Sequence, residues 1–349
     1  MHEAKKKFER KLVKEAKKKP KMFYSYLRSK IKNKSSIGPL KDGDKVVSDD
    51  IGMANVLNKF FATVFTIEND NLPAQIPCDL PEKQDHIDFP ENSIIEKIKK
   101  LKPDSAFGPD KIGPRVLQAT ADILCAPLAF VFRKSMEEGV VPDDWRMGNI
   151  TLIFKSGSRM AAGNCRPVSL TCICKLMESI IRDNMVLHLS KYELINASQH
   201  GFMAQESCQT NLIEYLNTLT KLVDEGYSVD VIYLDFAKAF DKVPHRRLLL
   251  KLEANGISGK VLHWIQSWLT RRLQRVVLNS SVSDLMSVTS GVPSIRVGGR
   301  LPQSYKVYIL TFGYLSKYLD ENVHCLWSEL CCCTVFPLYR ISTFGWEVG

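Results

Sequence analysis

The sequence contains no long hydrophobic run. No apolar stretch reaches the roughly 20 residues that a membrane-spanning helix needs, and the first residues lack the apolar core of a secretory signal peptide. We therefore expect an intracellular protein of the nucleus or cytoplasm, neither secreted nor partnered with a membrane. The 349 residues, 45% of them hydrophobic, are enough for two or three domains with a substantial core.

Paired cysteine spacing is also missing. The ten cysteines include no Cys-x-x-Cys pair and no nearby histidine pattern, and Cys331, Cys332 and Cys333 form an adjacent run. Thiols stay reduced inside cells, and three adjacent cysteines cannot easily share one tetrahedral ion. We therefore expect neither a disulfide framework nor a zinc site.

Positive charge is scarce outside the N-terminus. Residues 1–34 contain 14 Lys or Arg and three Glu, whereas residues 35–349 contain 34 basic and 35 acidic residues. The formal net charge of +10 is therefore the property of an N-terminal arm. Such an arm suits a polyanion, usually a nucleic acid, although a solvated helix with a basic face would show the same run.

Apolar spacing and proline positions divide the chain into four parts. Residues 1–66 show three amphipathic helical stripes, the first two separated at Pro20, and form a basic helical segment. Residues 67–92 contain four prolines among scattered acids and are typical of a linker. Residues 93–293 alternate helical patterns with short β-branched runs, which predicts one α+β domain. Residues 294–349 have no clear periodicity, and we expect this tail to be poorly ordered.

A short apolar run that ends in a carboxylate lies at the centre of this domain. Residues 231–234 predict a buried strand, and Asp235 follows directly, with Asp241 six residues later. A strand that ends in an acid can hold a metal ion or a base. Either aspartate can equally cap a following helix, so the stretch alone leaves both interpretations open.

Two cations complete a possible site. Lys155 follows a predicted strand, and Arg166 begins another element eleven residues later. A cation pair facing the carboxylate of Asp235 is what a nucleotide-polymerising site requires. The cations would hold the triphosphate and the carboxylate would hold Mg²⁺.

Several sequence motifs resemble those of a known family. They occur at residues 108–110, 141–145, 153–157, 164–170, 198–202, 233–245 and 290–293. In this order they resemble the reverse transcriptases of non-LTR retrotransposons, in particular those of Jockey-like clades. Residues 1–66 also resemble the family's segment between endonuclease and polymerase. The resemblance implies the fingers and part of the palm of a right-hand polymerase, with an RNA template, a DNA primer and dNTPs as partners.

The resemblance assigns roles to the nucleotide side of the site. Asp235 and the backbone carbonyl of Phe236 would hold the catalytic Mg²⁺ pair. Lys155 and Arg166 would contact the triphosphate, and Phe240 would act as the steric gate that excludes a 2′-hydroxyl.

Further residues have supporting or structural roles under the same resemblance. Gly291 and Pro293 would open the loop that supports the template and primer. We expect Asp241 to be a structural cap and His200 a packing or turn residue. His245 is expected to cap a helix or to lie exposed.

The resemblance stops after residue 293. The family continues with Gln-Gly-Ser, an apolar helix and an aromatic-x-Asp-Asp hairpin, whereas residues 294–299 read Ser-Ile-Arg-Val-Gly-Gly. Residues 294–349 contain no Asp-Asp pair, and nothing in them resembles a thumb. Because one carboxylate and one carbonyl cannot hold two Mg²⁺ ions, we expect that this chain alone does not polymerise. The alternatives are a non-catalytic RNA- or DNA-binding remnant and a translated relic without function.

Overall fold

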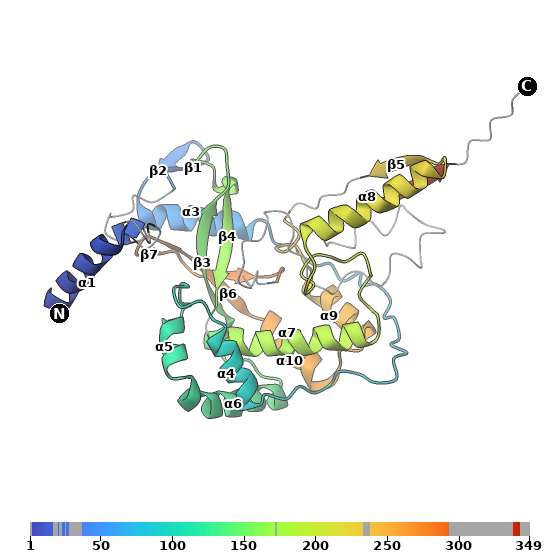
Figure 1. Ribbon diagram of the computed structural model, residues 1–349, viewed down its shortest axis with the longest axis horizontal. Coiled ribbons are helices and arrows are strands. Elements are labelled where there is room, and N and C mark those ends of the chain that lie inside the picture. The colour runs from blue at the N-terminus through green and yellow to red at the C-terminus, as the bar shows by residue number, and fades with distance from the viewer. Residues whose placement is uncertain are drawn as a thin grey trace, which may run out of the picture.

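The computed structural model consists of helices and strands in a mixed α and β arrangement (Figure 1). It describes residues 2–16, 20, 23–24, 26–27, 37–171, 173–232, 238–292 and 338–342. The helices are α1 (His2–Glu15), α3 (Asp50–Ala62), α4 (Glu91–Lys99), α5 (Pro114–Ala119), α6 (Ala121–Glu138), η1 (Asp143–Arg146), η2 (Ala162–Asn164), α7 (Cys174–Lys191), α8 (Cys208–Asp224), α9 (His245–Ala254) and α10 (Gly259–Leu269). The strands are β1 (Leu40–Asp42), β2 (Lys45–Val47), β3 (Met147–Phe154), β4 (Cys165–Leu170), β5 (Ser228–Ile232), β6 (Arg272–Leu278), β7 (Ser281–Val282), β8 (Met286–Val288) and β9 (Leu338–Ser342). The predicted α+β class agrees with this content.

The central sheet is built around β3. This strand pairs with β4 in an antiparallel hairpin and with β6 in parallel, and β6 also pairs with β7 and β8. After α10, β6 pairs in antiparallel fashion with both of the short strands that follow it. The sheet therefore joins three parts of the chain that are far apart in the sequence.

Helix α3 covers one face of this sheet. Its N-cap residue Asp49 accepts a hydrogen bond from the Gly52 amide at 2.6 Å, and Leu57 on its apolar stripe packs in one core with Ile150 and Val276. The predicted third stripe is thus confirmed as a core helix. Its main partner is β6, more than 200 residues later in the chain.

A larger helical layer lies below the sheet in Figure 1. Its core surrounds Trp264 of α10 and Phe132 of α6, both fully buried. The Trp264 indole donates a hydrogen bond to the Ser135 hydroxyl at 2.9 Å. Fully buried side chains of this kind form a close-packed core, which fixes the helices that support the sheet.

Residues 114–138 form two consecutive helices, α5 and α6. Thr120 separates α5 from α6, with φ −116° and ψ 13°, and its hydroxyl donates to the Val116 carbonyl. A threonine hydroxyl that bonds the preceding turn competes with the regular helix. Gly139 ends α6 in the left-handed conformation, as its position after the apolar stripe predicts.

Residues 67–90, predicted as most of a linker, connect α3 to α4, and their last part buries Ile87 and Phe89 in the core of the helical layer. The Gln84 amide donates to the Gly256 carbonyl at 2.8 Å, and the Ser258 amide donates to the Gln84 carbonyl at 3.0 Å. Glu82 also forms an ion pair with Lys191 of α7. This segment is thus attached to the helical layer at several points along its length.

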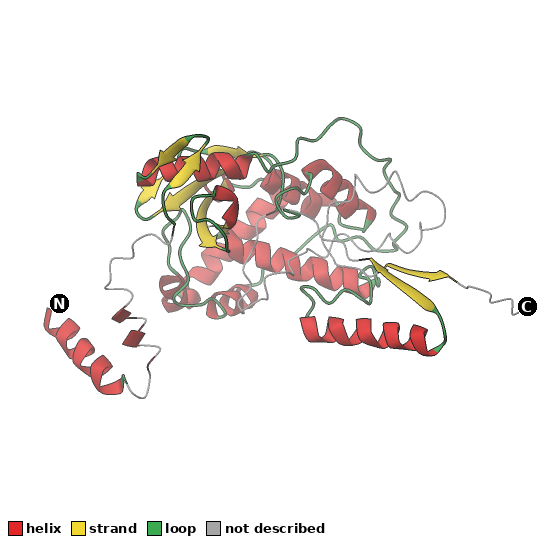
Figure 2. Ribbon diagram, turned by 90° about the horizontal axis from the view of Figure 1, so that it is seen from above, coloured by secondary structure: helices red, strands yellow, loops and turns green. Residues whose placement is uncertain are grey.

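Helix α8 differs from the other long helices because none of its side chains, all of which are described, is buried. It runs beside β5, which pairs in antiparallel fashion with β9 of the tail. Figures 1 and 2 both show α1 at one end of the molecule and α8 at the other. We call α8, β5 and β9 the α8 arm.

Among the described residues, no helix has both the length and the apolar character to cross a bilayer.

Candidate nucleotide-binding site

The predicted site residues fall into two groups. Lys155, Arg166, Phe240 and Gly291 are described by the structure. Asp235, Phe236 and Pro293 lie outside the described residues, so their predicted roles stay predictions.

The loop end of the β3–β4 hairpin carries the two predicted cations. The Lys155 amide donates to the Asn164 carbonyl at 2.9 Å, one step beyond the last strand pair. Arg166 stands opposite Ile153 in the ladder. The loop between them is closed by Gly157 in the left-handed region, with φ +84°, packed on Asn164. The hairpin therefore brings together two cations that are eleven residues apart.

A tight turn at residues 238–243 faces the hairpin. The amides of Asp241 and Lys242 both donate to the Lys238 carbonyl, at 3.0 and 3.1 Å. Lys238 adopts the left-handed conformation, with φ 57°. Since few non-glycine residues adopt this conformation, the surrounding structure must hold the turn in place.

Residues 290–292 clamp this turn. The Gly291 amide donates to the Val243 carbonyl at 2.8 Å, and the Val292 amide donates to the Phe240 carbonyl at 3.0 Å. The Ser290 hydroxyl donates to the Asp241 carbonyl at 2.6 Å. These three hydrogen bonds bind both sides of the turn to one short segment.

Gly291 has no room for a side chain. Its φ is +87°, and a Cβ atom would lie 2.7 Å from the Phe240 carbonyl oxygen and 2.9 Å from the Asp241 Cα. The His245 Nε2 atom also lies 2.8 Å from the Gly291 carbonyl oxygen. The expectation that His245 caps a helix or lies exposed is wrong, because the ring is half-buried against the clamp and burial lowers its pKa.

Asp241 is the acid on which the cations converge. Burial raises the pKa of the Asp241 carboxyl above its ordinary value. The positive charges that act against this effect belong, in decreasing order, to Lys238, Arg166 and Lys155. Asp241 does not cap α9, which begins at His245 after Pro244. The prediction that Asp241 caps a helix is therefore wrong for α9. The Asp241 carboxyl lies in the turn, where the positive charges of Lys238, Arg166 and Lys155 act on it.

Sequence reasoning missed the support that α3 gives to this turn. The Thr66 amide donates to the Ser290 hydroxyl at 2.7 Å, and the Thr66 hydroxyl donates to the Lys242 carbonyl at 2.9 Å. Thr66 follows α3, so the clamp joins segments from three regions of the chain. No sequence signal identifies these contacts, since they depend on the folded arrangement of distant loops.

The described residues do not fit a magnesium site. Among them, no three His, Cys, Asp or Glu side chains lie together in a way that could hold a metal ion. The positive charges of Lys238, Arg166 and Lys155 act on the Asp241 carboxyl, and they oppose the binding of a metal cation there. The described part of the site is therefore suited to an anion.

His200 has a structural role, as expected. Its Nδ1 atom lies 2.7 Å from a Glu206 carboxylate oxygen, and its Nε2 atom contacts the Glu214 carboxylate of α8. Burial lowers the pKa of the His200 ring, but the two carboxylates together hold this pKa above its ordinary value. The ring thus attaches the preceding turn to the start of α8.

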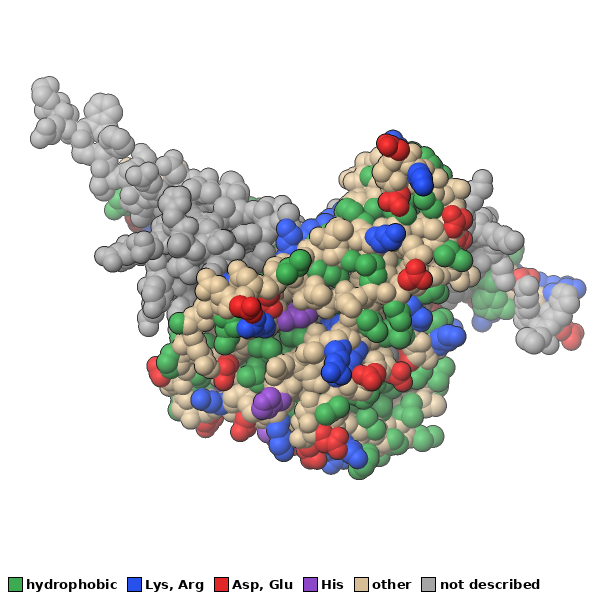
Figure 3. Space-filling model, turned by 180° about the vertical axis from the view of Figure 1, so that it is seen from behind, with side chains coloured by type: hydrophobic (Ala, Val, Ile, Leu, Met, Phe, Trp, Pro, Cys, Tyr) green, Lys and Arg blue, Asp and Glu red, His purple; other side chains and the backbone are tan. Residues whose placement is uncertain are grey.

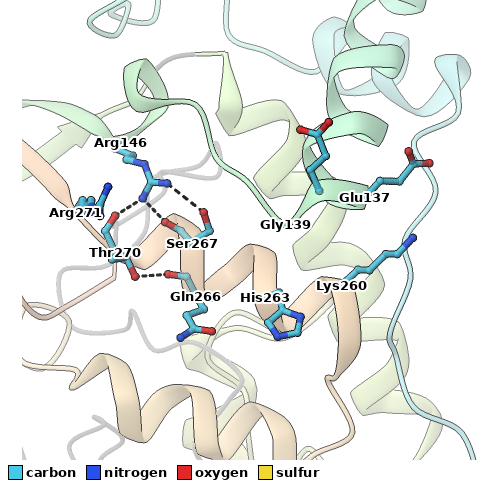
Figure 4. A pocket seen from close by; sticks show the side chains of 10 residues that line it. Glu137, Gly139, Arg146, Lys260, His263, Gln266, Ser267, Thr270 and Arg271 are labelled. Atoms are coloured by element: carbon cyan, nitrogen blue, oxygen red, sulfur yellow. Dashed lines mark hydrogen bonds between the residues drawn. The ribbon is translucent and has the colours of Figure 1, made fainter.

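A separate surface hollow of about 470 Å³ lies between the end of α6 and α10 (Figure 4). Glu137 and Glu138 line it together with Lys260 and Arg271, and the Arg146 guanidinium is occupied by bonds to backbone carbonyls. The hollow includes none of the predicted site residues. Its mixed charge favours no class of ligand.

Acidic and basic side chains are intermixed over much of the face in Figure 3. This distribution agrees with the near balance of charge outside the N-terminal arm. Lys and Arg side chains are also visible in the hollow at the upper edge of this view.

A hairpin that brings two cations to a clamped turn after a strand, beside a helical layer, fits the fingers and palm of a nucleotide-polymerising domain. Comparison with known proteins agrees, because residues 153–294 match the family described as reverse transcriptase (RNA-dependent DNA polymerase). Residues 153–294 are therefore similar to a reverse transcriptase domain.

Three curated relatives show the extent of the similarity. The RNA-directed DNA polymerase from mobile element jockey of Drosophila funebris is 25% identical over 256 residues, which cover 72% of this chain and 27% of the relative. Its counterpart in Drosophila melanogaster is 28% identical over 215 residues, covering 60% and 23%. The probable RNA-directed DNA polymerase from transposon BS of Drosophila melanogaster is 25% identical over 280 residues, covering 75% and 30%. The matched part is less than a third of each relative's length.

Proposed function

We propose that this domain derives from an RNA-directed DNA polymerase, that it still binds the triphosphate of a nucleotide, and that this chain alone does not polymerise. The observation that carries the proposal is the placement of Lys155 and Arg166 at one end of the β3–β4 hairpin, within the matched region, where their charges also act on the Asp241 carboxyl. Phosphoryl transfer depends on positioning and charge stabilisation, so a site can keep its phosphate contacts after the chemistry is lost.

The metal part of the site is the reason to propose inactivity. Asp235 and the Phe236 carbonyl are the only candidates that the family motif offers for Mg²⁺ in this sequence, and residues 294–349 contain no Asp-Asp pair. Mg²⁺ demands octahedral oxygen ligands with compensating charge. Within the printed sequence, the proposed ligand set is therefore incomplete.

Primer extension tests the proposed inactivity. The purified chain is incubated with a primed RNA template, dNTPs and Mg²⁺, and a jockey-type reverse transcriptase serves as the positive control. We expect no product above background. Clear extension by this chain would overturn the proposal.

Nucleotide binding tests the retained contacts. We propose that Lys155 and Arg166 contact the triphosphate, that Phe240 stacks under the sugar, and that Gly291 and Pro293 support template and primer. Lys155→Ala and Arg166→Ala should each weaken dATP binding about tenfold or more, because a charge-assisted hydrogen bond is lost. Unchanged affinity in both variants would reject the contacts.

The basic arm favours a second function, binding of RNA or DNA without chemistry. In α1 the side chains of Lys6, Lys7, Arg10 and Lys11 are exposed, whereas Leu12 is buried. Such a helix can place its cations on a phosphate backbone. Log affinity for RNA should fall linearly with log salt, and the slope should flatten when residues 1–34 are deleted. If the chain does not bind RNA even at low salt, this second function is rejected, and the remaining alternative is a translated relic without function.

A further inference from the structure

The proposed phosphate site contains a cation that the family resemblance did not assign. Lys238 contributes the strongest of the three positive charges on the Asp241 carboxylate, ahead of Arg166 and Lys155. Its backbone carbonyl accepts the two hydrogen bonds that close the turn. Lys238 is therefore fixed to the same rigid element as the buried acid.

An aromatic ring holds the Lys238 side chain. The Nζ atom lies 5.8 Å from the centroid of the Phe60 ring, within the range of a cation–π interaction. Phe60 belongs to α3, which precedes the matched region 153–294. An ammonium group attracted to a ring face has fewer directions open to it than one on a free surface lysine.

The same ring lies against the hairpin loop. A Cβ atom on Gly163 would stand 3.3 Å from the Phe60 Cζ atom, so the loop backbone passes close over the ring. Gly163 precedes Asn164, whose carbonyl accepts the Lys155 amide. Phe60 thus contacts both the loop that carries two of the cations and the side chain of the third.

The charges leave a positive excess at this place. Among the described residues, the partly buried carboxylate of Asp241 is opposed by three cations, and none of the three forms an ion pair with it. Cations held near one point without direct neutralisation attract an anion with several negative charges. A triphosphate is such an anion, whereas a monophosphate carries too little charge to engage all three.

We infer that Lys238 is a third phosphate-contacting cation of the nucleotide site and that Phe60 is its positioning residue, so that α3 forms part of this site. The inference rests on the proposed function, because it deepens the binding of the triphosphate. It also makes a separate prediction, which is that Lys238 contacts the triphosphate and does not contact the nucleoside.

Binding of dATP, dAMP and inorganic tripolyphosphate to the full chain tests the inference by titration calorimetry. Lys238→Ala and Lys238→Gln should bind dATP and tripolyphosphate about tenfold more weakly and should leave the weaker dAMP binding nearly unchanged. Lys238→Arg should restore most of the affinity. Neither Ala nor Gln relieves the left-handed backbone, since only glycine adopts it freely.

Two further variants separate positioning from folding. Lys242→Ala is the matched control, because it removes the same charge from the same turn, and it should bind dATP like the wild type. Phe60→Leu keeps an apolar side chain in the core but removes the ring face. It should weaken dATP and tripolyphosphate binding by a few-fold while dAMP binding stays unchanged.

The outcomes distinguish this inference from the function on which it rests. If Lys155→Ala loses dATP binding and both Lys238→Ala and Lys238→Gln keep it, the inference is wrong and the proposed function stands. An equal loss of dATP and dAMP in the Lys238 variants would indicate a structural role and would also overturn it. If the wild-type chain binds neither dATP nor tripolyphosphate, both proposals fail.

Discussion

Helices α6 and α8 have almost the same length, 18 and 17 residues, but they are held by different forces. α6 buries seven side chains in the helical layer and has no side-chain hydrogen bond at its N-cap. α8 buries none and begins with a complete capping box between Ser207 and Thr210. A helix without a buried face depends on its caps and local pairs, because most helical stability in proteins comes from packing.

This difference predicts a sharp contrast between the two regions. Changes in the helical layer should affect the whole domain, whereas changes in the α8 arm should affect that arm alone. Local opening free energies in one protein range from near zero up to the global value. The predictions that follow can break or refine the contrast, and they run from the largest expected effect to the smallest.

Trp264→Ala should give the largest effect. The side chain is 1% exposed, and its removal leaves a cavity and takes the hydrogen bond from Ser135. We expect a loss of about 3–5 kcal/mol in unfolding free energy, measured by urea denaturation. Ile123→Ala in α6 is the control, because Ile123 is 78% exposed and should change stability by less than about 0.5 kcal/mol. Similar losses in both variants would contradict the proposed role of the core.

Gly291→Ala should have the second largest effect. Gly291 belongs to the clamp at residues 290–292, which holds the turn that follows α8 and β5 in the chain. The added Cβ atom would clash with the Phe240 carbonyl and occupy a left-handed backbone. We expect a loss of about 2 kcal/mol in unfolding free energy.

Gly113→Ala provides the matched comparison for Gly291→Ala. Gly113 has an ordinary φ of −81°, and a Cβ atom there meets nothing within 4 Å. It should be neutral or slightly stabilising. The unfolding free energy of both variants is measured by urea denaturation. An unchanged value for Gly291→Ala would show that the clamp can shift to accept a side chain without loss of stability.

Ser207→Ala should act on the α8 arm alone. The substitution removes the hydroxyl that accepts the Thr210 amide and should destabilise α8 by about 1 kcal/mol. Hydrogen exchange of the α8 amides should accelerate about fivefold while amides in α6 are unaffected. Ser258→Ala is the control, since Ser258 stands at the N-cap of α10 but makes no side-chain cap bond among the described residues. A global loss of protection in Ser207→Ala would mean that α8 is coupled to the core.

The pH dependence of the α8 arm should be the smallest effect. Because the folded pKa of His200 is raised, its contacts with Glu206 and Glu214 contribute stability that is complete below the unfolded pKa of about 6.5. This contribution is lost as the pH rises through the folded pKa. Limited proteolysis near residues 198–207 should therefore be faster above this pKa than at pH 6.

His200→Gln removes the titrating group and keeps a side chain that can donate a hydrogen bond. An unstructured peptide of the same sequence corrects for the pH dependence of the protease itself. After this correction, the cleavage rate of His200→Gln should not change with pH as that of the wild type does. An equal pH dependence in both proteins would assign the effect to another group.

The parts of the site that sequence could predict are those set by local rules. Lys155 and Arg166 lie near each other because the end of one hairpin strand pairs with the start of the next, and the apolar run before Lys155 indicates the first strand. The stripe at residues 53–64 also predicted a core helix, since its apolar spacing follows the helical period.

The remaining parts depend on contacts between distant segments. Asp241 is partly buried where Ser290 and Gly291 close over its turn, and no pattern around residue 241 signals them. Phe60 lies more than 170 residues before Lys238, so its contact with the lysine could not be predicted from spacing. The break between α5 and α6 at Thr120 has no clear signal in the sequence, because the apolar pattern continues through it.

The pairing of α3 with β6 has a consequence for synthesis. A ribosome completes α3 at residue 62 but does not complete β6 until residue 278. At about 5–20 residues per second, this interval lasts roughly 10–40 s. During that time Leu57 and Phe61 lack the strand that covers them, so a nascent chain exposes an apolar helix next to its basic arm. Chaperones and nucleic acid would thus meet α3 and the basic arm before the central sheet is complete.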